Sequence, residues 1–151
     1  MRRVASVMFI FFALATSGCS YSTDFAIVNE SGAPVHLTYR FKAYPGKFEP
    51  AIPATVPLSE MGSKSNDWTK IDSSEYQVDE HNHSISLILK SGQAIRVASL
   101  HNYTGHDDRK KDFPIEELLI VGTHGQSQFT GDQVRRNFEK LSANLYTLGY
   151  K

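Results

Sequence analysis

The chain has 151 residues, 40% of them hydrophobic, and its 16 basic side chains balance 16 acidic ones. This length fits one domain with or without a tail, and the absence of net charge argues against a nucleic-acid-binding protein. A single cysteine excludes an internal disulfide and any metal site built from several cysteines.

The first twenty residues have the pattern of an export signal. Residues 1–3 form a short basic start, and residues 4–15 carry no charge. This run is too short to cross a membrane as a helix and has the length of the apolar part of a signal peptide. The small residues up to Gly18, followed by Cys19, resemble the lipobox of bacterial lipoproteins, although Thr16 stands where that motif most often has Leu. The alternative is an ordinary secretory signal with a chance cysteine.

The lipoprotein resemblance implies an address. Cleavage falls between Gly18 and Cys19, and Cys19 then carries several acyl chains, which anchor a protein durably in a membrane. Because Ser20 rather than Asp follows, the sorting rule of Gram-negative lipoproteins implies the outer membrane, with the domain in the periplasm or at the cell surface. We therefore expect a signal peptide at 1–18, a lipidated tether at 19–23 and a folded domain at 24–151.

Alternation of apolar and polar residues predicts that the folded domain is built from strands. The expected strands are 24–29, 34–42, 75–78, 84–90, 94–100, 115–122 and 145–150, with a doubtful edge strand at 55–58. Prolines and polar residues make most of 43–70 an irregular connection, which Trp68 is expected to attach to the core.

One short helix is expected near 131–141. Val134, Phe138 and Leu141 stand at helical spacing, and Thr130 or Asp132 is the expected N-cap. Because helices do not alternate with strands, the pattern argues against an α/β architecture. The pattern favours an all-β fold, a single antiparallel β-sandwich of seven or eight strands that is immunoglobulin-like in the broad sense.

The strands at 84–90 and 94–100 are expected to form a hairpin. Their apolar residues face one core only if the loop has an odd length, so a three-residue loop ending at Gly92, in a left-handed conformation, is predicted. This register pairs Leu87 with Ile95 and Ile85 with Val97.

The same register suggests a metal site. Asp79, His81 and His83 share one face if the strand extends back that far, and His101 falls opposite His81. Three imidazoles and a carboxylate suit zinc or copper. The alternative is that residues 80–83 form a solvated turn whose histidines are unrelated.

Other candidates for chemistry are few. No recognised catalytic motif is present, and Cys19 is reserved for lipid. Adjacent strand residues point to opposite faces, so Glu116 and Glu117 are not expected to form an acid–base pair. Tyr44, Phe48 and Tyr103 fall in predicted loops and are candidates for contacts with a ligand or partner.

These observations predict a non-enzymatic, outer-membrane-anchored binding or assembly module that contacts another envelope protein and needs no cofactor beyond its lipid. A periplasmic inhibitor or immunity protein, acting on an enzyme or toxin, is the alternative. A metal-binding lipoprotein, built on the histidines, is a weaker one.

Overall fold

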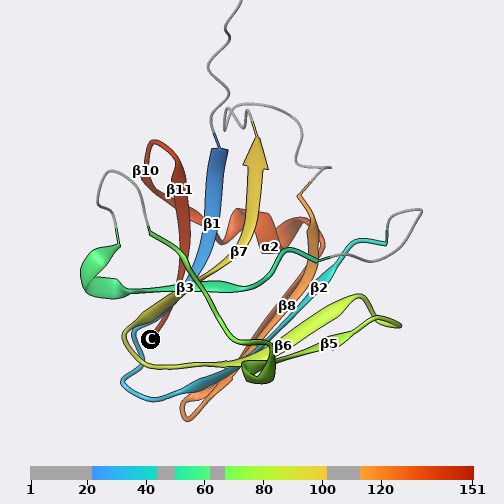
Figure 1. Cartoon of the computed structure of the whole chain (residues 1–151), viewed down its shortest axis with the longest axis horizontal. Coiled ribbons are helices and arrows are strands. Elements are labelled where there is room, and N and C mark those ends of the chain that lie inside the picture. The colour runs from blue at the N-terminus through green and yellow to red at the C-terminus, as the bar shows by residue number, and fades with distance from the viewer. Residues whose placement is uncertain (1–21, 44–49, 62–66, 102–112) are drawn as a thin grey trace, which may run out of the picture.

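The computed structural model describes residues 22–43, 50–61, 67–101 and 113–151, which fold into two packed β-sheets (Figure 1). Within these ranges the chain forms eleven strands, one short α-helix and two 3-10 turns. Among the residues described, no helix has the length and apolar character needed to span a bilayer. Cys19, Tyr44, Phe48 and Tyr103 lie outside the described ranges, so the predictions made for them stay predictions.

Sheet A has six strands in the order β10-β11-β1-β7-β3-β4. Their bounds are β10 Glu139–Ser142, β11 Leu145–Tyr150, β1 Ser22–Asn29, β7 Gln93–His101, β3 Ala54–Pro57 and β4 Thr69–Lys70. The doubtful strand at 55–58 therefore exists as β3, but β4 covers its outer side, so it is not an edge strand.

Sheet B has five strands in the order β5-β6-β2-β8-β9. Their bounds are β5 Tyr76–Asp79, β6 Ser84–Leu89, β2 Val35–Phe41, β8 Ile115–Gly122 and β9 Gly125–Thr130. The 3-10 turns η1 (Leu58–Glu60) and η2 (Ser73–Glu75) and the helix α2 (Asp132–Arg136) lie in connections between strands.

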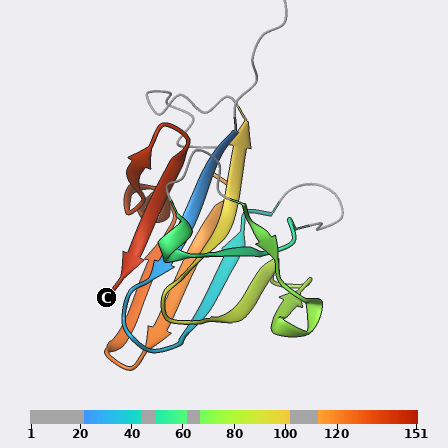
Figure 2. The same cartoon turned by 60° about the vertical axis from the view of Figure 1, so that its left-hand side comes forward.

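The two sheets, which Figures 1 and 2 show from two sides, share one apolar core. Alternate residues of each central strand point inward, as strand geometry requires. The core includes Phe25, Ile27, Ile95, Val97 and Leu148 from sheet A and Val35, Leu37, Tyr39, Ile85, Leu87, Leu89, Ile115, Leu118 and Ile120 from sheet B. The predicted all-β, sandwich-like architecture is therefore confirmed.

The expectation of a purely antiparallel fold is wrong for sheet A. β1 pairs with β11 in parallel, from Asp24 beside Leu145 to Asn29 beside Tyr150, whereas the other strand pairs in the described ranges are antiparallel. Parallel neighbours need a long crossover. Here nearly the whole chain lies between the two strands.

The predicted hairpin between β6 and β7 is also wrong. β6 pairs with β2 and β5 in sheet B, so Leu87 lies beside Leu37 and Tyr76. β7 pairs with β1 and β3 in sheet A, so Ile95 lies beside Ile27. Gly92 does adopt a positive φ of 73°. An odd loop length also fits a chain that crosses from one sheet to the other, because the apolar side chains of both strands then still face the same core.

The predicted helix ends earlier than expected. α2 stops at Arg136 and has Gly131 as its N-cap residue, with no side-chain capping bond, so the predicted caps Thr130 and Asp132 are wrong. Val134 and Phe138 are buried as expected, but Leu141 belongs to β10 and is 53% exposed. Pairing with β11 holds this segment extended and overrides the helical spacing.

Trp68 packs on the side of sheet A that faces away from the core. It contacts a second apolar cluster built on Val28, Val56 and Ala94. The Trp68 Nε1 donates a hydrogen bond of 2.8 Å to Asp24 Oδ2, and the Arg96 guanidinium lies 5.6 Å from the centre of the indole ring. The connection is thus attached to the sheet, but not to the main core.

Candidate binding face

The outer face of sheet B, turned away from the core, carries the side chains that alternate with the core residues. On β2 these are His36, Thr38 and Arg40. His36 lies between Ile88 of β6 and Val121 of β8, both of which are exposed large hydrophobic residues. A row across three strands is thus formed by Ile88, His36 and Val121. We call it the apolar row, after its two exposed hydrophobic side chains.

A surface pocket of about 550 Å³ occupies the other end of the same face. It lies where β2 ends and where β6 and β8 begin, beside the turn that joins β5 to β6. The lining residues are Thr38, Arg40, Phe41, Ala43, His81, Asn82, His83, Ser84, Glu116, Glu117 and Leu119.

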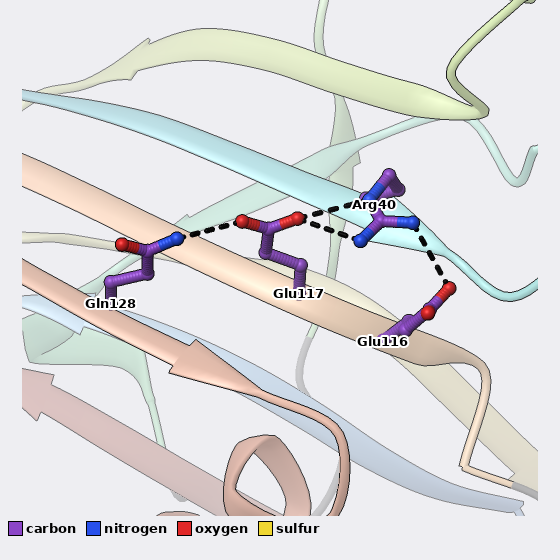
Figure 3. Close-up of polar contacts among 4 residues, drawn as sticks. All are labelled: Arg40, Glu116, Glu117 and Gln128. Carbon is purple, nitrogen blue, oxygen red and sulfur yellow. Dashed lines mark hydrogen bonds and ion pairs between the residues drawn. The ribbon is translucent and has the colours of Figure 1, made fainter.

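Arg40 is the centre of the polar network in this pocket (Figure 3). Its Nη2 and Nε donate to Glu117 Oε2 at 2.8 and 3.0 Å, and its Nη1 donates to Glu116 Oε2 at 3.2 Å. Gln128 of β9 donates to Glu117 Oε1 at 2.8 Å. The hydrogen bonds from Arg40 and then from Gln128 hold the pKa of Glu117 below its usual value, and the bond to Glu117 raises the pKa of Arg40.

A β-bulge brings both carboxylates to one arginine. Arg40 pairs with Glu117, but the next residue, Phe41, pairs with Ile115, which leaves Glu116 as the extra residue of β8. A bulge turns the extra residue out of the regular alternation. The side chains of Glu116 and Glu117 therefore both reach Arg40, and the prediction that they point to opposite faces is wrong.

The β5–β6 turn is held by Asp79. Its Oδ1 accepts the backbone N–H groups of His81 and Asn82 at 3.0 Å each, and its Oδ2 accepts the Asn82 amide at 2.7 Å. These bonds, led by those from Asn82, lower the pKa of Asp79. Residues 80–83 form a turn, with His83 at a φ of 52°. The strand does not extend back through the histidines, so the expected turn at residues 80–83 is confirmed.

The register that gathered the histidines is wrong. His81 and His83 line the pocket of sheet B, whereas His101 ends β7 and pairs with Ser22 in sheet A. The Asp79 carboxylate is occupied by the turn. In the part of the chain that the structure describes, no three His, Cys, Asp or Glu side chains are arranged to hold a metal ion.

Several polar groups on this face are paired with one another. The Arg40 guanidinium binds both Glu116 and Glu117. The hydroxyls of Thr38 and Ser86 are 2.9 Å apart on the adjacent strands β2 and β6. Such groups present fixed donors and acceptors to a molecule that docks on the face.

Most residues of this face escaped the sequence prediction. The alternation in β2 places Arg40 opposite the core residues, but its partners lie on a strand far along the chain. Ile88 and Val121 fall within the predicted strands 84–90 and 115–122, and only the sheet register shows that His36 separates them.

Comparisons with known proteins add no family. No protein-family model, no curated protein and no solved structure matches this chain.

Proposed function

We propose that this protein is a lipid-anchored, non-catalytic binding module of the bacterial cell envelope, and that its binding surface is the outer face of sheet B. The observation that carries the proposal is the apolar row beside the polar pocket. Isolated exposed hydrophobic residues are ordinary, but exposed hydrophobic residues gathered on one face favour an interaction site. Here two of them lie on one ordered sheet.

The chemistry of the face favours a protein partner. The apolar row supplies a small area for burial. On one side of it lie the paired hydroxyls of Thr38 and Ser86 and then the polar pocket, like part of the rim of a protein–protein interface. The proposed partner is another envelope protein. The finer fold that we propose, an immunoglobulin-like sandwich in the broad sense, suits this role because such scaffolds present rigid faces.

The proposed anchor is lipid on Cys19, and the proposed address is the outer membrane, with the domain in the periplasm or at the surface. The support is the lipobox-like stretch that ends at Cys19 and the Ser20 that follows it. No catalytic group and no cofactor other than the lipid takes part in the proposed function.

The anchor is tested by the intact mass of the protein purified from membranes. We expect loss of residues 1–18 and the added mass of two groups on Cys19: a diacylglyceryl group on its sulfur and an acyl chain on its amino nitrogen. A Cys19→Ser variant should lose this mass and leave the membrane fraction. Recovery of an unmodified Cys19 thiol in membrane-bound protein would contradict the anchor.

The binding face is tested with two matched isoleucines. Ile88, in the apolar row, is 56% exposed, and Ile52, outside the face, is 48% exposed. We expect the wild-type protein to co-purify with one stoichiometric envelope protein after chemical cross-linking, Ile88→Asp to lose at least tenfold of that yield, and Ile52→Asp to keep it. Equal yields from both variants would overturn the assignment of the face.

A further inference from the structure

The segment between the proposed lipid on Cys19 and the start of β1 is very short. If Cys19 carries the lipid, only Ser20 and Tyr21 separate it from Ser22, where β1 begins. Three peptide units reach about 11 Å at full extension. The lipid chains hold Cys19 at the bilayer surface, so the first residue of β1 stays within about that distance of the lipid headgroups.

The neighbours of Ser22 define which end of the molecule this is. On one side, Ser22 pairs with His101, the last residue of β7. On the other side, the backbone N–H of Asp24 donates to the Asn144 carbonyl at 2.9 Å, in the turn between β10 and β11. The start of β1, the tip of β7 and this turn lie together at the top of Figures 1 and 2. We call them the β1-start end.

The opposite end of sheet A is too far away to share this position. Eight residues of β1 span roughly 24 Å at the usual rise of a strand. At that far end the Gly92 N–H donates to the Asn29 carbonyl, and the Glu30 N–H donates to the Tyr150 carbonyl. The tether therefore keeps the β1-start end close to the bilayer, whereas the far end of the sheet can lie up to roughly 24 Å further out.

The β1-start end also carries an exposed apolar side chain. Leu141, next to the β10–β11 turn, is 53% exposed at a register shift between Lys140 and Ser142. Glu139 and Lys140 beside it have opposite charges, so this edge brings little net charge to the membrane. A single exposed Leu is ordinary on a protein surface, but when it is held this close to a bilayer, its transfer from water into the interface lowers the free energy.

We infer that the β1-start end is a membrane-contact surface: the protein stands on the bilayer through this end, with Leu141 and the β10–β11 turn against the lipid headgroups. The partner is a lipid surface. The inference rests on the proposed lipid anchor and adds to it a fixed orientation, in which the Gly92 end points away from the membrane.

The experiment uses the full lipidated protein with one added thiol. Because Cys19 is the only cysteine and its sulfur is bound in a thioether after lipidation, a new cysteine is the only free thiol. Leu141→Cys and Asn144→Cys place a bimane fluorophore at the β1-start end, and Ser91→Cys places it at the far end; all three positions are exposed. Each protein is reconstituted into vesicles of phosphatidylethanolamine and phosphatidylglycerol that contain a nitroxide-headgroup lipid.

We expect at least threefold stronger quenching at positions 141 and 144 than at position 91, with little change at high salt. Equal quenching at the three positions, or stronger quenching at 91, would overturn the orientation. Quenching of Leu141→Cys that appears only when other envelope proteins are added would assign Leu141 to a protein contact and overturn the lipid contact. The intact mass separates the two proposals: an unlipidated Cys19 removes both, whereas a lipidated protein with equal quenching removes only the orientation.

Discussion

Arg40 illustrates how a single residue organises the candidate face. Its guanidinium group binds Glu116 and Glu117, and Gln128 completes the network from the edge strand. These side chains are partly exposed, so the ion pairs contribute at most about 1 kcal/mol to stability. Their main effect is to hold the groups that line the pocket in one arrangement.

Substitution of Arg40 should be visible in a titration. In Arg40→Met the pKa of Glu117 should rise toward its usual value, because the largest cause of its lowering is removed. A folded-state pKa below the unfolded one stabilises the fold above the unfolded pKa, and this stability is lost as pH falls through the folded pKa. The variant should therefore lose up to about 1 kcal/mol at neutral pH and match the wild type in acid.

Carboxyl NMR titration and denaturant unfolding at neutral and acidic pH measure these two effects. Arg136→Met, which removes a 4.0 Å surface pair with Asp132, is the control and should leave the Glu117 titration unchanged. A stability loss in Arg40→Met that persists in acid would show that packing, rather than the ion pair, is responsible.

The two glutamates also show a limit of sequence reasoning at this scale. Strict alternation places Glu116 and Glu117 on opposite faces, and a bulge cancels that rule. Nothing in the local residues marks the bulge, because it arises where β2 and β8, far apart in the chain, come into register.

At the scale of elements, the β8–β9 hairpin depends on its contact with β11. The Tyr150 hydroxyl donates to the Gly125 carbonyl at 3.1 Å, so the last strand of sheet A binds the hairpin of sheet B. Gly122 makes this approach possible: a Cβ there would lie 2.7 Å from Tyr150 Oη and 2.9 Å from Cε1.

Gly122→Ala should therefore displace the Tyr150 ring and lower the free energy of unfolding by about 1–3 kcal/mol, the usual range for overpacking. Gly149→Ala is the matched control, since its added Cβ would meet only Glu30 Oε2, at 3.6 Å, and its effect should be small. Chemical denaturation compares the two. Equal stability of both variants would mean that the ring moves aside without loss.

The individual strands were largely predictable, but their partners were not. Alternation located β1, β2, β6, β7, β8 and β11, because each buries one face. It missed β4, β9 and β10, which bury none of their residues. It also misassigned β6 and β7 to one hairpin, because side-chain parity is the same for a hairpin and for a crossing between sheets.

At the scale of the whole molecule, the candidate face could not be derived from the sequence, because side-chain alternation does not show which strands are neighbours. The apolar row exists because β2 lies between β6 and β8, and that order depends on long-range pairing. The expected histidine site required β6 and β7 to be neighbouring strands, so that His81 would lie opposite His101, but these strands belong to different sheets. Composition and periodicity determine the all-β class, whereas sheet order determines which side chains meet.

The parallel pairing of β1 with β11 has a consequence for how this protein is made. β1 finds one of its two neighbours, β11, far along the chain, so sheet A is incomplete until β11 has been synthesised. Pairings of such high sequence separation slow folding, because a large chain entropy is lost before any contact is gained. A chain whose β11 has not yet been synthesised therefore lacks a complete sheet A and cannot reach the native fold.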